Sequence, residues 1–282
     1  MATLKELWWD VFRVIQRFRY SHEFQVLAKM PLFAPYSEGS PRARADLALQ
    51  AADQTFPLIG QLLADFDGLR PLRSQTSAAF CAGPASLQAA EELKLLFNKY
   101  GSDKSSTHDY HFIYGHLLNE PASVTRVLEI GLGSNNDDVV SNMGRLGHPG
   151  ASLRAFRDFL PNASVFGADI DTRVLFNETR IETYFVDQTD LKTFDDLGAK
   201  VGSDFDLIVD DGLHTINANL AVIIFGLPRL KAGGWLVVED IAPAALPAWR
   251  VIASLMPKGV RCELIEALDG LMFLLQKSRS AR

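Results

Sequence analysis

The sequence has few cysteines and no long apolar run, and its N-terminus lacks the charge pattern of a secretory signal. It contains two cysteines, Cys81 and Cys262, which lie far apart and lack the spacing of a metal-binding motif. This pattern is typical of reduced thiols in a cytosolic protein. No apolar run approaches the ~18 residues that span a bilayer, so we expect no stable membrane insertion. Glu6 and Asp10 stand where a secretory signal would carry positive charge, and we therefore expect a cytoplasmic protein.

A net positive charge is also missing. The formal net charge is −6, whereas a general nucleic-acid binder needs a basic face to neutralise phosphates. We therefore expect no nucleic-acid partner. The composition, with 48% hydrophobic and 22% charged residues, is that of an ordinary globular protein. The length allows one large domain, or one domain with a substantial extension.

The first 97 residues show helical periodicity and no convincing strand. Apolar residues recur every three or four positions between Leu4 and Phe18, which predicts a helix with one apolar stripe. Its basic residues and two tryptophans would also suit a membrane surface, but we favour packing on its own domain or on a second subunit. Further helices are predicted over 43–65 and over 86–100, with Gly101 just after the second.

From Arg126 onward, short β-rich runs alternate with helical stretches. The runs are rich in Val, Ile and Phe, as expected for parallel strands buried on both faces. They cover 126–130, 164–170, 183–186, 205–210 and 235–239, and the helices between them cover 151–160, 191–201 and 215–230. Two final runs, 260–266 and 271–277, flank Asp269-Gly270 and predict an antiparallel hairpin. The pattern indicates an α/β, Rossmann-like fold with a mostly parallel sheet.

A glycine turn, Gly131-Leu132-Gly133, follows the first of these strands directly. Two glycines let the backbone approach a ligand closely and adopt positive φ. Ligands of open α/β sheets bind at the carboxyl ends of the strands. A dinucleotide site fits poorly, because Asn136 occupies the third-glycine position and the next strand-end acid lies far beyond the usual ~20 residues. A purely structural turn remains the alternative.

Acidic residues end the next two strands. Asp169 follows the second strand, where a carboxylate can accept hydrogen bonds from both hydroxyls of a ribose. Asp171 can instead cap the next segment. Asp187, followed by Gln188, ends the third strand and can accept from the exocyclic amine of an adenine. This arrangement suits an adenosine without phosphates, because the acids would repel a phosphate.

A second set of polar residues closes the fourth and fifth strands. Asp211 and His214 follow the fourth strand, and Glu239 and Asp240 follow the fifth. If these strands are neighbours, their ends lie about 4.8 Å apart. Carboxylates so close need a cation or protons, and an oxygen-rich site suits Mg²⁺ or another hard divalent ion. The sequence places no cysteine or second histidine nearby, which disfavours zinc.

This set predicts a concrete reaction. A divalent ion that binds a substrate hydroxyl would orient it and make it more acidic. The imidazole of His214 would then accept the proton as general base, and the oxygen would attack an activated methyl group in line. The alternative is that the acids cap helices and that the histidine lies in a solvated loop.

These motifs resemble those of the metal-dependent sugar O-methyltransferases of macrolide biosynthesis, of the mycinamicin 2″-O-methyltransferase type. The similar segments are VLEIGLG, SLRAFRDFLPNASVFGADID, IETYFVDQTD, FDLIVDDGLH and GGWLVVED, preceded by KYGSDK and by His108 and Tyr110. They cover about residues 98–242. The resemblance implies a class I S-adenosylmethionine (SAM)-dependent methyltransferase domain over 98–282 with a seven-stranded sheet. Residues 1–97 would be a helical extension that forms a substrate wall or an oligomer contact.

The resemblance also implies roles for individual residues. Asp211, Glu239 and Asp240 would bind the metal, and His214 would be the general base. The implied cofactor contacts are Glu129, Gly131, Gly133, Asp169, Asp187, Gln188 and Lys104. The chain departs from the family at Leu213, where a small hydroxylated residue is common, and at Ser134-Asn135-Asn136, where a second glycine is common. The long segment between the first strand and its helix is predicted to be a lid over SAM.

The sequence therefore predicts a SAM- and divalent-metal-dependent O-methyltransferase. Its acceptor would be a sugar hydroxyl of a glycosylated natural product or glycan precursor, and the protein would form a homo-oligomer. One alternative is a hydroxylase-like tailoring protein with the same fold and metal ligands. Another is a non-catalytic subunit that binds SAM or a partner protein, although the complete set of acids and histidine weighs against it.

Overall fold

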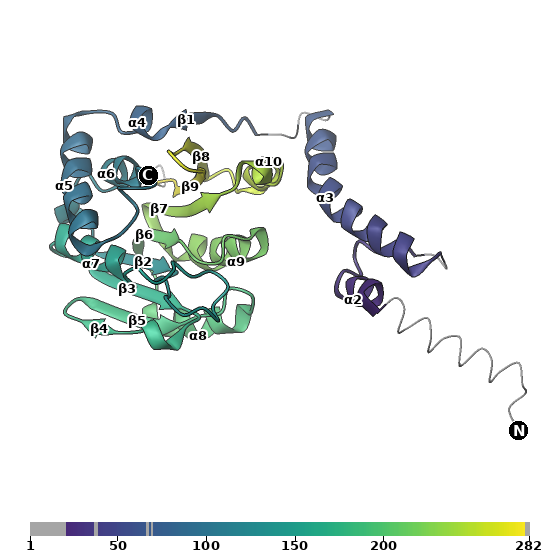
Figure 1. Cartoon of the computed structure of the whole chain (residues 1–282). Coiled ribbons are helices and arrows are strands. Elements are labelled where there is room, and N and C mark those ends of the chain that lie inside the picture. Colours follow the sequence, from purple (N-terminus) through teal and green to yellow (C-terminus); the bar gives the residue numbers. More distant parts are fainter. Residues whose placement is uncertain (1–20, 37–38, 66–67, 69, 280–282) are drawn as a thin grey trace, which may run out of the picture. The chain divides into compact units, whose positions relative to one another are not determined.

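The computed structural model describes residues 21–36, 39–65, 68 and 70–279, and the chain divides into two compact units, Met1–Leu69 and Arg70–Arg282 (Figure 1). The first contains α2 (Ser21–Lys29) and α3 (Pro41–Asp65), which pack against each other. The helix predicted between Leu4 and Phe18 lies outside the described residues.

The second unit is built on a nine-stranded sheet with the order β1-β8-β9-β7-β6-β2-β3-β5-β4. The seven strands from β8 to β5 in this order match the predicted runs, and the sheet is mostly parallel with an antiparallel hairpin, as expected. Their bounds are β2 (Arg126–Ile130), β3 (Ser164–Asp169), β5 (Ile181–Phe185), β6 (Phe205–Asp210), β7 (Leu230–Ile241), β8 (Val260–Glu266) and β9 (Leu271–Lys277).

Two short strands at the edges were not predicted. β1 (Ser74–Thr76) pairs parallel with β8, and β4 (Asn177–Glu178) pairs antiparallel with β5. The expectation of no strand before residue 100 was therefore wrong. Strands of two or three residues are too short to show an alternation of apolar and polar residues in the sequence. They are recognised only by their hydrogen bonds to a neighbouring strand of the sheet.

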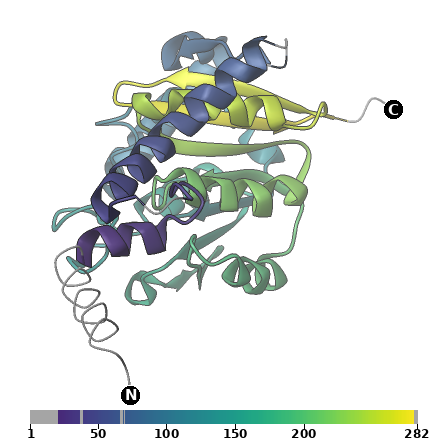
Figure 2. The ribbon, with the colours of Figure 1, turned by 90° about the vertical axis from the view of Figure 1, so that its right-hand side faces the viewer.

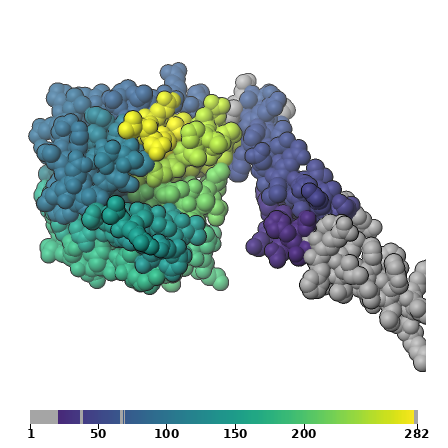
Figure 3. Space-filling view, viewed as in Figure 1, coloured from purple at the N-terminus to yellow at the C-terminus, as the bar shows by residue number. Residues whose placement is uncertain are grey.

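Helices cover both faces of the sheet (Figures 1 and 2). α5 (Pro84–Tyr100), α6 (Tyr110–Leu117) and α7 (Ala151–Phe159) lie on one face. α8 (Leu191–Val201), α9 (Ile216–Gly226) and α10 (Leu246–Leu255) lie on the other. A short helix, α4 (Ser77–Phe80), follows β1. The space-filling view shows one face of the second unit (Figure 3).

The strands supply alternate side chains to the two cores. Val127 and Val165 join the core under α5, α6 and α7, whereas Leu128 and Phe166 join the core under α8, α9 and α10. Successive side chains of a strand point to opposite faces. A strand that is buried on both faces therefore reads as a continuous apolar run, which is why these strands could be recognised in the sequence.

Several element boundaries differ from the predictions in detail. α5 begins at Pro84 after Gly83, two residues before the predicted start of this helix at residue 86. Gly101 ends α5 in the left-handed conformation, with φ of 77°, as predicted. The β8–β9 connection covers residues 267–270, as the predicted bounds of the two runs imply, because Glu266 pairs with Leu271.

The boundary between the two units lies after Leu69, whereas the sequence predicted a domain boundary after residue 97. α5 packs closely against α6 and α7, with Leu93 and Phe97 fully buried in the core of the second unit. α5 therefore belongs to the second unit by its contacts. No helix in the described part of the chain is long and apolar enough to cross a membrane.

Candidate active site

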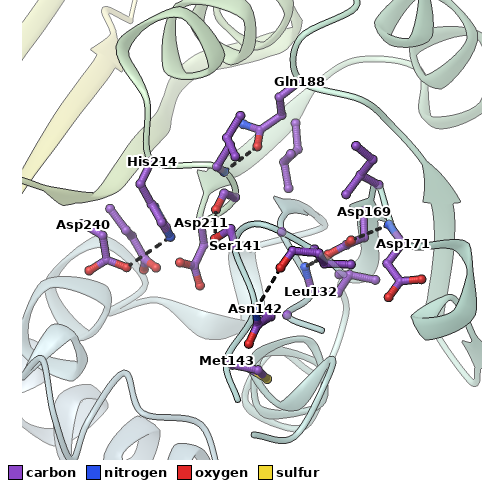
Figure 4. Close-up of a pocket in the computed structure, with 18 of the residues that line it drawn as sticks. Leu132, Ser141, Asn142, Met143, Asp169, Asp171, Gln188, Asp211, His214 and Asp240 are labelled. Atoms are coloured by element: carbon purple, nitrogen blue, oxygen red, sulfur yellow. Dashed lines mark hydrogen bonds and ion pairs between the residues drawn. The ribbon is translucent and has the colours of Figure 1, made fainter. Parts of the chain in front are cut away.

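The carboxyl ends of five strands meet at one cavity of about 740 Å³ (Figure 4). β5, β3, β2, β6 and β7 are adjacent and parallel, so their ends lie at the same edge of the sheet. The loop between α5 and α6 and the segment between β2 and α7 complete the walls. All of the predicted site residues line this cavity except Glu129, which is fully buried.

The glycine turn after β2 is held against the end of β3. Gly131 and Gly133 have φ of 95° and 79°, in the region that favours glycine. Asp169, at the end of β3, accepts hydrogen bonds from the backbone N–H of Leu132 at 2.7 Å and of Asp171 at 2.8 Å. Burial raises the pKa of Asp169, although these bonds oppose the increase. The structure therefore brings together the turn and the acid predicted to bind ribose.

Asp171 caps the segment that follows β3, which the sequence left open. It accepts from the backbone N–H of Arg173 at 3.1 Å, at the start of a short helical turn. It also accepts from the Ser134 hydroxyl and from the Asn136 amide, each at 2.6 Å. Ser134 and Asn136, the departures from the family pattern, thus tie the segment after β2 to the end of β3.

Gln188 links the ends of β5 and β6. Its Oε1 accepts from the backbone N–H of Leu213 and its Nε2 donates to Asp210, both at 2.8 Å. Because both ends of its amide have protein partners, Gln188 positions the loop after β6. The neighbouring Asp187 lines the cavity and accepts from the backbone N–H of Thr189 at 2.8 Å.

Asp210 is a buried carboxylate that the sequence did not single out. It accepts from Gln188 and also from the amide of Asn219 at 2.8 Å. Burial raises the pKa of Asp210 to about 6, although both amides lower it. Asn219 lies in α9, and an asparagine in an apolar helix gave no signal in the sequence. Together these bonds fix the loop that carries Asp211 and His214.

Asp211, His214 and Asp240 converge at one end of the cavity (Figure 4). Each offers one ligand atom, and these atoms lie within 4.8 Å of one another. His214 Nε2 lies 3.8 Å from Asp240 Oδ2. His214 and Asp240 both have positive φ, 55° and 54°, a costly conformation for residues other than glycine that is often found at functional sites. The two carboxylates offer the oxygen ligands that a hard divalent ion prefers, and the imidazole lies beside them.

Glu239 lies deeper and has other partners. It forms an ion pair with Lys104 and accepts a hydrogen bond from the hydroxyl of Tyr114. Burial raises the pKa of Glu239 well above its ordinary value, and the charge of Asp211 adds to the increase. Lys104 also contacts Asp211 at 2.6 Å and Glu129 at 3.3 Å. Although burial opposes it, these three carboxylates hold the pKa of Lys104 well above its ordinary value.

A second histidine lies near the site, contrary to the sequence-based interpretation. His108 lines the cavity, and its Nδ1 is 3.8 Å from Asp240 Oδ1. The ring of His108 stacks on Tyr110, with centroids 4.9 Å apart, and the Tyr110 hydroxyl donates to Asp240 Oδ1 at 2.5 Å. The sequence-based interpretation missed this proximity because His108 and Asp240 are far apart in the sequence. Only the folding of the second unit brings them together.

The segment between β2 and α7 covers one side of the cavity. Ser141, Asn142 and Met143 line the cavity together with His148 (Figure 4). The Ser141 hydroxyl donates to the carbonyl of Gly212 at 2.8 Å, which joins this segment to the loop after β6. Its position is compatible with the predicted lid, which remains a prediction.

No family model matches the chain. A Streptomyces olivaceus 8-demethyl-8-alpha-L-rhamnosyl tetracenomycin-C 2′-O-methyltransferase is 32% identical over 154 residues, covering 54% of this chain and 38% of the relative. The Micromonospora griseorubida mycinamicin VI 2″-O-methyltransferase is 35% identical over 128 residues, covering 44% and 29%. A Streptomyces antibioticus L-olivosyl-oleandolide 3-O-methyltransferase is 30% identical over 211 residues, covering 71% and 50%.

A solved structure supports the same fold. The MycE methyltransferase from the mycinamycin biosynthetic pathway, in complex with Mg and SAH, has a TM-score of 0.55 and 23% sequence identity, covering 68% of this chain and 56% of that chain. The chain spans half or less of the length of the curated relatives it matches. The chain thus has the Rossmann-like fold of class I methyltransferases and is similar, over part of its length, to O-methyltransferases that modify sugars of glycosylated natural products.

Proposed function

We propose that this protein is a SAM-dependent and divalent-metal-dependent O-methyltransferase that acts on a sugar hydroxyl of a glycosylated natural product or glycan precursor. The observation that carries the proposal is the convergence of Asp211, His214 and Asp240 in the same cavity as the glycine turn and Asp169. The sugar O-methyltransferases to which the chain is similar support both the reaction and the class of acceptor.

The cofactor would lie along the glycine turn. The turn allows close approach of a ligand to the backbone, and Asp169 offers its carboxylate to ribose hydroxyls. Asp187 would accept from the adenine amine. Glu129 is buried and hydrogen-bonded by Ser152 at 2.6 Å, so we propose that it supports the wall of the cofactor site. These acids would disfavour a phosphate-bearing nucleotide in the same place.

Asp211 and Asp240 would hold Mg²⁺ or another hard divalent ion, with Glu239 as the third candidate ligand. When bound, this ion supplies a positive charge that makes a sugar hydroxyl more acidic. Tyr110, by its hydrogen bond to Asp240, keeps that carboxylate in place. His214 would accept the hydroxyl proton at a ring nitrogen, because it lines the cavity beside Asp211 and Asp240.

The chain's own residues then account for the remaining requirements of methyl transfer. Gln188 and Asn219, acting through Asp210 and Leu213, fix the loop that carries His214. Ser141 joins this loop to the segment over the cavity and would help to exclude water. Because SAM is already an activated methyl donor, orientation of the two reactants supplies much of the rate acceleration.

We also propose that the protein is cytoplasmic and forms a homo-oligomer through its N-terminal helices. Exposed apolar side chains on α3, including Leu58 and Leu62, support such a contact. A substrate wall formed by the same extension is part of this proposal. The acidic net charge argues against a nucleic-acid partner.

The test is a transfer assay with methyl-labelled SAM and a panel of rhamnosylated and other glycosylated polyketides. We expect labelled product in the presence of Mg²⁺, none in EDTA, and recovery when Mg²⁺ is returned. His214→Ala should abolish turnover, whereas His116→Asn, at a histidine outside the cavity-lining set, should retain it if the variant is folded. An unchanged rate in EDTA would remove the metal from the proposal.

Two other results would replace the proposed function. Oxygen incorporation without methyl transfer would indicate a hydroxylase-like protein. SAM binding without turnover across the panel would indicate a non-catalytic subunit. Calorimetric titration with SAM should give one site per chain if the proposal is correct.

A further inference from the structure

Lys104 is a lysine enclosed by acids. Its side chain is 2% exposed, and it comes from the loop between α5 and α6. The ammonium donates to Asp211 Oδ2 at 2.6 Å and to Glu239 Oε2, and it lies 3.3 Å from Glu129 Oε1. An ammonium has three N–H donors, and here three carboxylates surround it.

The other partners of these acids are neutral. Tyr114 donates a hydroxyl to Glu239, and Ser152 donates one to Glu129. Glu129 and Glu239 are almost completely buried, with 0% and 1% exposure. Burying carboxylates without a positive partner is strongly unfavourable, because hydrogen bonds from neutral groups do not balance their charge. Among the described residues, the ion pairs of Glu129 and Glu239 go to Lys104.

We propose that Lys104 is the resident counter-ion of Glu129, Asp211 and Glu239, and that it competes with a divalent ion for Asp211 and Glu239. As a positioning residue it keeps this acid cluster folded before any divalent ion binds. Its competition with the ion rests on the proposed function, whereas its role as counter-ion does not. This assignment differs from the predicted role of Lys104 as a cofactor contact.

The charges explain both parts of the proposal. The ammonium attracts the three acids and therefore stabilises the cluster. It also repels a divalent ion placed next to the same acids, because like charges a few ångströms apart repel strongly inside a protein. Removal of Lys104 should therefore destabilise the ion-free protein and strengthen divalent-ion binding at the same time. A cofactor contact would change neither property in this way.

The first experiment measures thermal unfolding of the full chain in EDTA. Lys104→Met should lower the melting temperature by roughly 10 °C. Adding Glu129→Gln should recover at least half of this loss, because it removes one uncompensated carboxylate without touching a candidate metal ligand. Lys99→Met is the control, since Lys99 is an exposed lysine of α5 paired with Asp158 at 3.1 Å. It should shift the melting temperature by no more than about 2 °C.

The second experiment measures Mn²⁺ binding by calorimetry without SAM or acceptor. Lys104→Met should bind Mn²⁺ at least tenfold more tightly than the wild type, and Mn²⁺ should raise its melting temperature more. If Lys104→Met is not recovered folded, Lys104→Gln is measured instead, because its amide keeps hydrogen-bond donors but carries no charge. The same direction of change is expected.

The outcomes separate this inference from the proposed function. A Lys104→Met protein that melts like the wild type, or that Glu129→Gln does not rescue, would overturn the counter-ion role. Unchanged or weaker Mn²⁺ binding would overturn the competition. A tenfold loss of SAM affinity with unchanged Mn²⁺ binding would return Lys104 to the cofactor contacts. Absence of Mn²⁺ binding to the wild type would contradict the metal in the proposed function, while the EDTA melting curves would still decide the counter-ion role.

Discussion

The backbone of Gly131 packs directly against the carbonyl oxygen of Asp211. A β-carbon on Gly131 would overlap this oxygen, and Gly131 has φ of 95°. The contact forms because β2 and β6 end side by side, with the Asp211 N–H donating to the carbonyl of Ile130 at 2.8 Å. The predicted cofactor turn and the predicted metal ligand therefore depend on each other for their positions.

Gly131→Ala should disrupt both parts of the site. We expect the free energy of unfolding to fall by roughly 3 kcal/mol, because the methyl group must displace backbone and the left-handed conformation is strained. SAM affinity should fall more than tenfold. Chemical denaturation and calorimetry measure the two effects.

Gly144→Ala is the matched control for this change. Gly144 also has positive φ, at 69°, but a β-carbon there meets no atom within 4 Å. It should cost only about 1 kcal/mol, which is the strain of the conformation alone. Equal costs for the two variants would show that the contact with Asp211 does not matter.

Tyr110→Phe should weaken metal-dependent turnover without unfolding the protein. The variant removes the hydroxyl that donates to Asp240 at 2.5 Å, and loss of such a partner of a metal ligand typically reduces affinity or activity by about 10- to 100-fold. The Mg²⁺ dependence of the initial rate measures this effect. Tyr184→Phe is the control, because the Tyr184 hydroxyl donates to Glu182 instead. A Tyr110→Phe enzyme with wild-type Mg²⁺ dependence would contradict the assignment of Asp240.

Asp158→Asn should reduce stability in a pH-dependent way. Burial raises the pKa of Asp158, but hydrogen bonds from Tyr100, Lys99 and Arg157 outweigh it and hold the pKa at about 2. The folded state therefore binds the proton less tightly than the unfolded state. Its stabilisation is complete above the ordinary aspartate pKa of about 4 and is lost as the pH falls through about 2.

Urea unfolding of wild type and Asp158→Asn between pH 7 and pH 3 checks this sign. At pH 7 the variant should be less stable by about 1 kcal/mol, a figure reduced to allow for solvent screening. The difference should shrink toward pH 3. Asp196→Asn, at an exposed position of α8, should show no such trend. A difference that stays constant down to pH 3 would refute the pairing.

The proposed oligomer contact is tested by a charge substitution on α3. Leu58 and Leu62 are exposed by 61% and 57%, and buried carboxylates at an apolar interface are unfavourable. Leu58→Glu/Leu62→Glu should lower the molar mass measured by light scattering from that of an oligomer to that of one chain. A wild-type protein that elutes as a single chain would contradict the oligomer directly.

The sequence by itself determined the core of the sheet and the residue types at its edge. β2, β6, β8 and β9 have the predicted bounds, because strands buried on both faces or paired in a hairpin leave a local apolar pattern. The glycine turn and the strand-end acids could be assigned to one cavity because the carboxyl ends of parallel strands share an edge. These conclusions depend only on local sequence patterns and on the rule that parallel strands end at the same edge of a sheet.

Only the tertiary structure decided which side chains meet within that cavity. Lys104, His108 and Tyr110 reach the acids because α5 and α6 pack on the sheet and carry their connecting loop to its edge. The structure also separates Glu239, which is buried against Lys104, from Asp240, which faces His214. Such contacts join residues that are far apart in the sequence. Local sequence patterns, which reflect only residues close together in the chain, therefore do not predict them.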